Sequence, residues 1–213
     1  MTAHRTRIKI CGITSPDAAW CAVEAGADAL GFVFAPASPR FIEPEAAWDI
    51  ASALPPFITT VGLFVNPSLE TLDTAREDFP FDIIQLHGNE PEPLVRDAGP
   101  DVIKAVRFDP ATIESELLKW SRIAEITALL IDGSSGGKGT TFDWNALAQV
   151  ADSSDHPLII AGGLDAQNVA QAVRTVRPYA VDVSSGVESE PGLKDPRKIA
   201  EFCAAVRRAD AEV

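Results

Sequence analysis

Two residues able to exchange protons stand at the ends of apolar runs that are typical of buried strands. Cys11 ends the run at residues 8–11, and Asp132 follows the run at residues 128–131. A thiol acts as a base or nucleophile once it is partly ionised, and a carboxyl group can donate or accept a proton. Taken singly, Cys11 could be a packing residue and Asp132 a turn cap. The pair predicts proton-transfer chemistry if the fold brings both side chains to one site.

Two glycine-bearing turns follow the apolar runs at residues 158–161 and 180–183. These turns contain Gly162, Gly163, Ser184, Ser185 and Gly186. Backbone N–H groups in such turns, and at the helix N-termini behind them, bind phosphate. Glycines that only make tight turns are the alternative. We predict a phosphate site formed by both turns.

The chain is strongly acidic, with 18 Lys and Arg against 31 Asp and Glu and a formal net charge of −13. Such a field repels nucleic acids and anionic membrane surfaces, so we expect neither as a partner. It also repels an anionic metabolite, which therefore needs local positive groups. The expected partner is a small phosphorylated substrate.

Arg40 and His87 are further polar residues that follow strand-like runs. Arg40 could pair bidentately with a substrate carboxylate or orient Asp132. A solvated surface arginine fits its position equally well. His87 is either a group that supports the site or a polar turn residue.

The histidines and cysteines show no pattern of metal ligands or disulfides. They are His4, His87 and His156, and Cys11, Cys21 and Cys203. Because three cysteines without a CxxC pair leave an odd thiol, we expect free thiols in a reducing compartment and no bound metal. The longest apolar stretch, residues 29–37, is too short to span a bilayer, and no apolar signal-peptide core is present. We therefore expect a cytoplasmic protein.

Short apolar runs alternate with stretches of helical periodicity along the chain, which is typical of parallel strands joined by crossover helices. The predicted strands are residues 8–11, 29–34, 59–64, 83–86, 102–106, 128–131, 158–161 and 180–183. This α/β pattern without a linker predicts one domain over residues 1–213, a single (β/α)₈ TIM barrel. An open sheet of this size would leave exposed edges. In a barrel the C-terminal ends of the strands share one mouth, and we place the sixth strand opposite the first.

Helix boundary signals support the crossovers. Ser15 with Pro16 predicts the start of the first helix, and Asp195 with Pro196 predicts a last helix that runs to about residue 208. We expect Asp165 to cap the N-terminus of the helix that follows the first glycine-bearing turn. The weaker helix predictions are residues 45–53, 68–78, 90–98, 113–120 and 144–150.

Several short segments, in order and at matching spacing, resemble one known family. They are residues 9–13, 31–34, 38–40, 62–66, 85–88, 142–144, 161–164, 168–169, 182–188, 191–192 and 194–195. Any one segment is weak evidence, whereas the ordered set is highly specific. The chain resembles the phosphoribosylanthranilate isomerase family of tryptophan biosynthesis from residue 9 to about residue 198.

The resemblance implies an Amadori rearrangement of N-(5-phosphoribosyl)anthranilate to 1-(2-carboxyphenylamino)-1-deoxyribulose 5-phosphate, with no cofactor. It implies that Asp132 is the general acid that protonates the furanose ring oxygen. Cys11 then removes the C2′ proton, giving an enol that becomes the ketone, and Arg40 meets the anthranilate carboxylate. The other implied substrate-binding residues are His87, Gly162, Gly163, Asp182, Ser184, Ser185 and Gly186.

One segment departs from the family pattern. Where the family has Gly-Gly-Thr-Gly or Gly-Gly-Ser-Gly followed by Lys, residues 136–140 have Lys138 at the hydroxyl position and Thr140 at the Lys position. We interpret this segment as a lid over the site. The departure bears on lid contacts and not on the acid or the base.

Two alternatives remain for the function. A catalytically silent barrel that binds a phosphometabolite would share the phosphate turns. The histidine-pathway aldose isomerase runs the same rearrangement, but it resembles two fused half-barrels with an aspartate pair, and this chain has Cys11 at the strand-one position. We expect a monomer.

Overall fold

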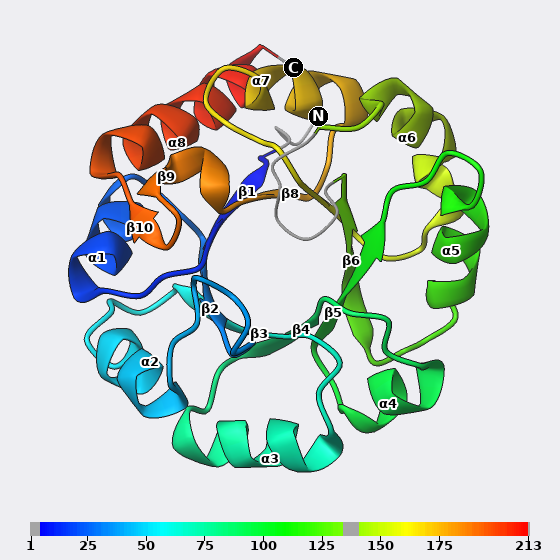
Figure 1. Ribbon diagram of the computed structural model, residues 1–213. Coiled ribbons are helices and arrows are strands. Elements are labelled where there is room, and N and C mark those ends of the chain that lie inside the picture. The colour runs from blue at the N-terminus through cyan, green and yellow to red at the C-terminus, as the bar shows by residue number, and fades with distance from the viewer. Residues whose placement is uncertain (1–4, 134–140, 213) are drawn as a thin grey trace.

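Eight parallel strands close into a barrel, as predicted (Figure 1). The computed structural model describes residues 5–133 and 141–212. The strands are β1 (Arg7–Cys11), β2 (Ala29–Val33), β3 (Thr59–Phe64), β4 (Ile83–Leu86), β5 (Val102–Arg107), β6 (Ile126–Asp132), β7 (Leu158–Ala161) and β8 (Ala180–Val183), and each pairs with the next. β8 pairs in parallel with β1, with Ile10 opposite Val183, and this pairing closes the ring.

The helices form the outer ring around these strands (Figure 1). They are α1 (Pro16–Glu24), α2 (Pro44–Ala51), α3 (Leu69–Asp78), α4 (Glu92–Asp97), α5 (Ile113–Trp120), α6 (Trp144–Val150), α7 (Val169–Val176) and α8 (Pro196–Ala211). α7 begins later than predicted because Asp165 closes a separate turn before it. The Oδ1 atom of Asp165 accepts from the backbone N–H of Gln167 at 2.9 Å and of Asn168 at 3.0 Å.

Local capping explains where two of the crossover helices begin. The side chain of Ser15 accepts from the backbone N–H of Ala18 at 3.3 Å, with Pro16 as the first helical residue of α1. Asp195 plays the same part for α8 and accepts from the backbone N–H of Arg197 at 2.9 Å. Each cap satisfies N–H groups that have no partner inside the helix.

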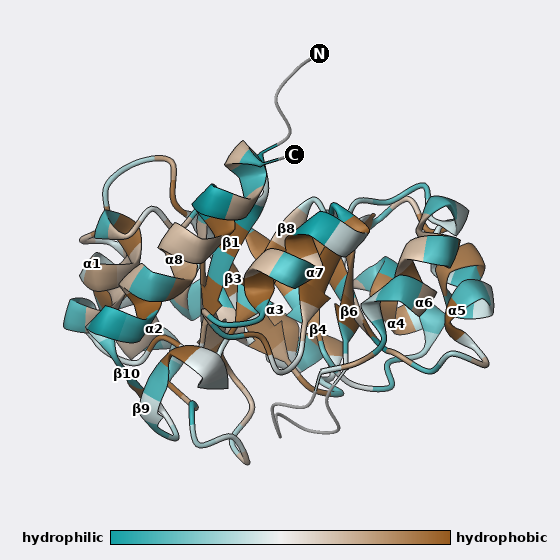
Figure 2. Ribbon diagram, turned by 90° about the horizontal axis from the view of Figure 1, so that it is seen from above, coloured by the Kyte–Doolittle hydropathy of each residue, from teal (hydrophilic) through white to brown (hydrophobic). Residues whose placement is uncertain are grey.

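Strand side chains alternate between two apolar layers. One layer lies between the barrel and the helices and includes Ile8, Ile10 and Phe32. The other fills the barrel and is made by Val61, Ile103, Ala105, Ala128, Leu130, Ile159, Ala161 and Ala180. Figure 2 shows hydrophobic colouring concentrated on the strands and polar colouring on the helices. Burial on both faces explains why the strands are nearly continuous apolar runs.

An antiparallel hairpin follows β8, which the sequence patterns do not predict. It consists of β9 (Glu188–Glu190) and β10 (Leu193–Lys194), reached through a 3₁₀ turn at Ser185–Val187. The hairpin carries Glu188 and Lys194, two charged residues that are buried. It therefore brings charge to the edge of the barrel mouth.

Cys11, Cys21 and Cys203 are all free thiols, as predicted. Cys21 lies half-buried in α1 and Cys203 is buried in α8, as expected for packing residues. Among residues 5–133 and 141–212, no helix has the length and apolar character needed to cross a membrane.

Candidate active site

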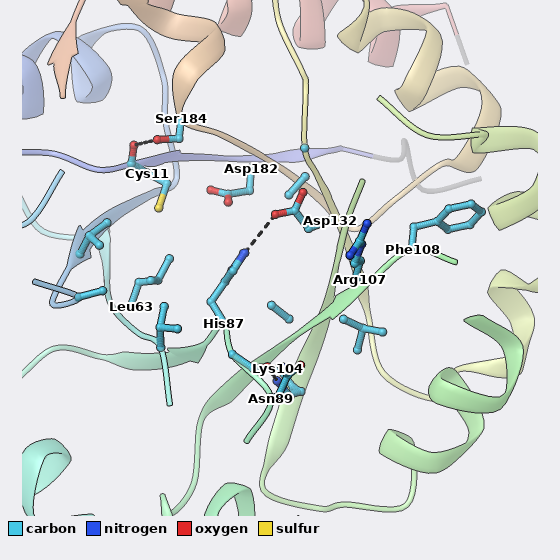
Figure 3. Close-up of a pocket in the computed structure, with 18 of the residues that line it drawn as sticks. Cys11, Leu63, His87, Asn89, Lys104, Arg107, Phe108, Asp132, Asp182 and Ser184 are labelled. Atoms are coloured by element: carbon cyan, nitrogen blue, oxygen red, sulfur yellow. Dashed lines mark hydrogen bonds and ion pairs between the residues drawn. The ribbon is translucent and has the colours of Figure 1, made fainter. Parts of the chain in front are cut away.

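A cavity of about 1280 Å³ opens at the C-terminal ends of the strands. Of the predicted site residues, it is lined by Cys11, Arg40, His87, Asp132, Gly162, Gly163, Asp182, Ser184 and Ser185. Figure 3 shows Cys11 and Asp132 on two sides of this cavity with Asp182 between them. Gly186 lies behind the cavity wall, where a Cβ atom would come within 1.9 Å of the carbonyl oxygen of Leu164. The barrel therefore gathers side chains that are far apart in sequence.

Cys11 ends β1 and is 4% exposed. Burial raises the pKa of its thiol, and the nearby charges of Lys9 and Lys194 lower it without cancelling the effect of burial. Asp182 acts in the same direction as burial. The thiolate is thus costly in this site, and the two lysines supply the positive charge that favours it.

Lys9 and Asp182 form a buried ion pair inside the barrel beside the thiol. The Lys9 Nζ atom lies 2.8 Å from Asp182 Oδ1, with the two side chains only 4% and 8% exposed. Burial lowers the pKa of Lys9, but Asp182 and Cys11 outweigh burial and raise it overall. Lys9 is therefore a fixed positive charge near Cys11.

Gly31 on β2 makes room for this arrangement. It stands opposite Cys11 in the strand register. A Cβ atom at Gly31 would lie 2.8 Å from Cys11 Sγ and 3.0 Å from Lys9 Nζ. The absence of a side chain at residue 31 lets the thiol and the ammonium group share this space.

Asp132 ends β6 and is held by His87. The Nε2 atom of His87 lies 3.1 Å from Asp132 Oδ2 (Figure 3). The Nδ1 atom of His87 lies 2.9 Å from the Nε2 atom of Gln85. The suggestion that Arg40 orients Asp132 is wrong, because the guanidinium of Arg40 is bound elsewhere. Two strands, β7 and β8, separate β6 from β1, so Asp132 lies obliquely across the mouth from Cys11 and not diametrically opposite.

Arg40 makes a bidentate ion pair with Glu188 of β9. Its Nε and Nη2 atoms donate to the two carboxylate oxygens of Glu188 at 2.7 and 2.8 Å. Lys194 donates to the same carboxylate at 2.7 Å. Burial raises the pKa of Glu188, but the hydrogen bonds from Arg40 and Lys194 outweigh burial and lower it overall. Arg40 is thus a positioned cation and not a solvated one.

The loops after β7 and β8 expose backbone groups to the cavity. Gly162 and Gly163 have φ of 83° and 66°, which is the left-handed region that glycine adopts without strain. Ser184 Oγ donates to the carbonyl oxygen of Cys11 at 3.0 Å, while Lys194 donates to the carbonyl oxygen of Ser184 at 3.1 Å. These contacts hold the β8 loop against β1, with the Lys194 charge beside it.

A second buried ion pair fixes the loops after β3 and β4. The Glu90 carboxylate accepts from Lys104 Nζ at 2.7 Å and from the backbone N–H groups of Asn66 and Gly88 at 2.9 and 2.8 Å. Burial raises the pKa of Glu90, but Lys104 and the backbone hydrogen bond from Asn66 outweigh it and lower the pKa overall. The loop that carries His87 is therefore tied to β5.

Comparison with known proteins identifies the family. The protein-family model that describes N-(5'-phosphoribosyl)anthranilate isomerases matches residues 8–205 of this chain. The chain belongs to this family. An enzyme of this name from Magnetococcus marinus is 48% identical over 203 residues, which cover 95% of this chain and 96% of the relative.

Solved structures of N-(5'-phosphoribosyl)anthranilate isomerases share the fold. The crystal structure from Thermotoga maritima has a TM-score of 0.87 at 40% identity and covers 95% of this chain and 99% of that chain. A further crystal structure contains the enzyme with reduced 1-(o-carboxyphenylamino)-1-deoxyribulose 5-phosphate and has a TM-score of 0.85 at 40% identity, covering 95% of this chain and 99% of that chain. The resemblance inferred from the sequence is confirmed.

In this member of the isomerase family, the sequence patterns assigned no individual role to several polar residues of the site. These are Lys9, Gln85, Arg107, Glu188 and Lys194. For Lys9 and Gln85 a signal existed, because each interrupts an otherwise apolar strand, and a buried polar group needs a partner. Glu188 and Lys194 gave no such signal, since their burial depends on the unpredicted hairpin.

In the part of the chain that the structure describes, no group of three or more His, Cys, Asp and Glu side chains is arranged to hold a metal ion. The lid segment at residues 136–140 lies outside the described residues.

Proposed function

We propose that this cavity carries out the isomerisation of N-(5'-phosphoribosyl)anthranilate, with Asp132 as the general acid and Cys11 as the base. The observation that supports these roles is the placement of a thiol and a carboxyl group around one cavity, with glycine-bearing loops beside them. One barrel domain supplies all of these groups. The reaction needs no cofactor in this proposal, and a biosynthetic enzyme with free thiols fits the cytoplasm.

The acid step opens the sugar ring. Asp132 gives its proton to the furanose ring oxygen as the bond from that oxygen to C1′ breaks, and the nitrogen lone pair forms a C=N bond to C1′. Asp132 is left as a carboxylate that accepts from His87 Nε2 at 3.1 Å. His87 therefore stabilises the charge that the acid step creates.

The base step completes the isomerisation. The Cys11 thiolate removes the proton from C2′, and that electron pair forms the C1′=C2′ double bond while the C=N electrons return to nitrogen, which gives the enol. The enol gains a proton at C1′ and loses its C2′ hydroxyl proton to become the ketone. The product contains the same atoms as the substrate and is therefore its isomer. Because burial raises the pKa of Cys11, the adjacent positive charge of Lys9 is needed to make the thiolate accessible.

Arg40 and the β7 and β8 loops bind the two anionic ends of the substrate in this proposal. A guanidinium carries five N–H donors, and the two contacts of Arg40 with Glu188 leave others for the anthranilate carboxylate. The phosphate is assigned to the backbone N–H groups around Gly162, Gly163, Ser184 and Ser185. A locally positive site offsets the net charge of −13.

The test is steady-state isomerisation of freshly generated substrate, followed by loss of anthranilate fluorescence. Cys11→Ser and Asp132→Asn should each lower kcat by at least about a hundredfold while still binding product. Matched controls are Cys21→Ser on α1 and Asp155→Asn in an exposed turn, and both should keep wild-type rates. A wild-type protein that binds product without turnover would instead support the silent phosphometabolite-binding barrel.

A further inference from the structure

Gln85 is an amide side chain in an unusual position inside the barrel. It lies on β4, is 0% exposed, and places its Nε2 atom 2.9 Å from His87 Nδ1. Its Oε1 atom is buried and has no hydrogen-bond partner within the described ranges 5–133 and 141–212. Buried polar atoms in native proteins are nearly always hydrogen-bonded, so this one calls for a physical reason.

The amide orientation determines where the imidazole proton lies. An amide nitrogen only donates, so Nδ1 of His87 must offer a lone pair to Gln85. A neutral ring then carries its proton on Nε2 and donates it to the Asp132 carboxylate. In this orientation the His87–Asp132 pair holds one proton.

When the His87–Asp132 pair gains a second proton, Nδ1 of His87 needs a hydrogen-bond acceptor where it previously needed a donor. If Asp132 becomes a carboxylic acid that donates to Nε2, the ring proton must move to Nδ1, and if His87 becomes an imidazolium, Nδ1 is also protonated. In both cases Nδ1 needs an acceptor, which an amide nitrogen cannot be. Turning the Gln85 amide by half a rotation presents Oε1 instead, and the two ends of an amide are nearly the same size.

We propose that Gln85 is a positioning residue whose amide turns over with the protonation state of the His87–Asp132 pair. It presents its nitrogen when the pair holds one proton and its oxygen when the pair holds two. The inference rests on the proposed function, in which Asp132 is the acid. Proton transfer to the ring oxygen converts the two-proton pair into the one-proton pair, and solvent restores the proton before the next turnover.

The charged and titratable groups near this network come from several elements. They are Cys11 and Lys9 from β1, Glu90 from the loop after β4, Lys104 and Arg107 from β5, and Asp182 from β8. None of them is replaced when only Gln85 is changed. The neutral Gln85→Met variant therefore reports on the amide, whereas Gln85→Glu also adds a carboxylate inside the barrel.

Nitrogen-15 NMR of the imidazole ring tests the tautomer without turnover. Histidines occur only at residues 4, 87 and 156, so the His87 signals are readily assigned. At pH about 8, wild type should show the Nε2–H tautomer, because Nδ1 faces the amide nitrogen of Gln85. Gln85→Glu should protonate Nδ1 at the same pH, because a carboxylate only accepts. Gln171→Glu, on the exposed face of α7, is the matched control and should leave the His87 signals as in wild type.

The pH dependence of turnover gives the second measurement. In Gln85→Glu the pair should keep its second proton to higher pH, so the falling limb of kcat/KM should move up by about one pH unit or more. Gln85→Met, which can neither donate nor accept through an amide, should lower kcat at least about tenfold with KM nearly unchanged. If Gln85→Glu does not fold, Gln85→Met carries both measurements.

Three results would separate the two proposals. An Nδ1–H tautomer in wild type at pH about 8 overturns the role of Gln85. A Gln85→Met enzyme with the wild-type tautomer and pH profile overturns it as well. A wild-type protein without turnover overturns the proposed function. Comparison of the His87 tautomer in resting wild type and in resting Gln85→Glu still decides whether Gln85 determines which ring nitrogen carries the proton.

Discussion

Lys9 is the residue whose charge most directly affects the proposed base. It lies two positions before Cys11 on β1, so both side chains point into the barrel. Its positive charge lowers the pKa of Cys11, while the negative charge of Asp182 raises it. Two substitutions should therefore shift the thiol in opposite directions.

Lys9→Met should raise the pKa of Cys11 further, and Asp182→Asn should lower it. Each unit by which the pKa rises reduces the thiolate population at neutral pH about tenfold, so kcat/KM of Lys9→Met should fall in proportion to the measured rise in pKa. The measurement is the ultraviolet absorbance of the thiolate during a pH titration, with Cys21 and Cys203 replaced by Ser. Shifts of the same sign in both variants would contradict the electrostatic account.

Gly31→Ala tests the space beside the thiol. The added methyl group would lie 2.8 Å from Cys11 Sγ and 3.0 Å from Lys9 Nζ, so both groups must move. We expect kcat to fall at least about tenfold, because displacement of a reacting group by a fraction of an ångström is costly. A urea denaturation curve should show a folded protein, and wild-type kcat in a folded variant would count against the packing argument.

At the scale of elements, the β9–β10 hairpin holds Arg40 in place. Glu188 accepts both donors of the Arg40 fork and the ammonium group of Lys194. A guanidinium held in this way loses little entropy when it binds a carboxylate. In the proposed function, the hairpin therefore prepares Arg40 for binding the substrate carboxylate and takes no part in bond breaking.

Glu188→Gln should raise KM about tenfold and change kcat much less, because it weakens ground-state and transition-state binding alike. Glu190→Gln is the matched control, since Glu190 is exposed on the same hairpin. Steady-state kinetics of both variants make the comparison. A large fall in kcat with an unchanged KM would show that Glu188 acts on the chemical step instead.

The Lys104–Glu90 pair joins the loops after β3 and β4 to β5. Lys104→Met should lower the free energy of unfolding by about 3–5 kcal/mol, because it leaves the Glu90 carboxylate buried without its cation. Replacing Glu90 by Leu in addition should restore part of this loss. Urea denaturation of the single and double variants measures both effects, and equal stability of the two would contradict the assignment.

The positions of helices and strands could be predicted from the sequence wherever a single local pattern determines the structure. Strands such as β3 and β7 lie at the predicted residues because apolar runs buried on both faces have few alternatives. The catalytic candidates followed, since a barrel places strand ends at one mouth. The hairpin and the Arg40–Glu188 pair did not follow, because they depend on contacts between residues 148 positions apart. No local pattern encodes such a contact.

At the scale of the whole molecule, acid should unfold the protein through its buried carboxylates. The pKa values of Glu90 and Glu188 are lowered in the folded state. Their stabilisation is complete above the unfolded pKa of about 4.3 and is lost as pH falls through the folded value. Denaturation in urea at a series of pH values should show this decline, with a flatter slope in the double variant Glu90→Gln, Glu188→Gln.

The proposed site draws all its described residues from one chain, and we predict a monomer in solution. Sedimentation velocity over a range of concentrations should give one species of single-chain mass. A stable dimer would contradict the prediction and would not alter the assignment of Cys11 and Asp132.

The seam between β1 and β8 has a consequence for biosynthesis on the ribosome. Lys9 reaches its partner Asp182, and Cys11 its support Ser184, across 173 residues of chain in each case. A nascent chain that has emerged only through β7 carries the thiol without these partners. The proposed base therefore acquires its working environment only when the last strand docks, so we expect the enzyme to stay inert until its synthesis is nearly finished.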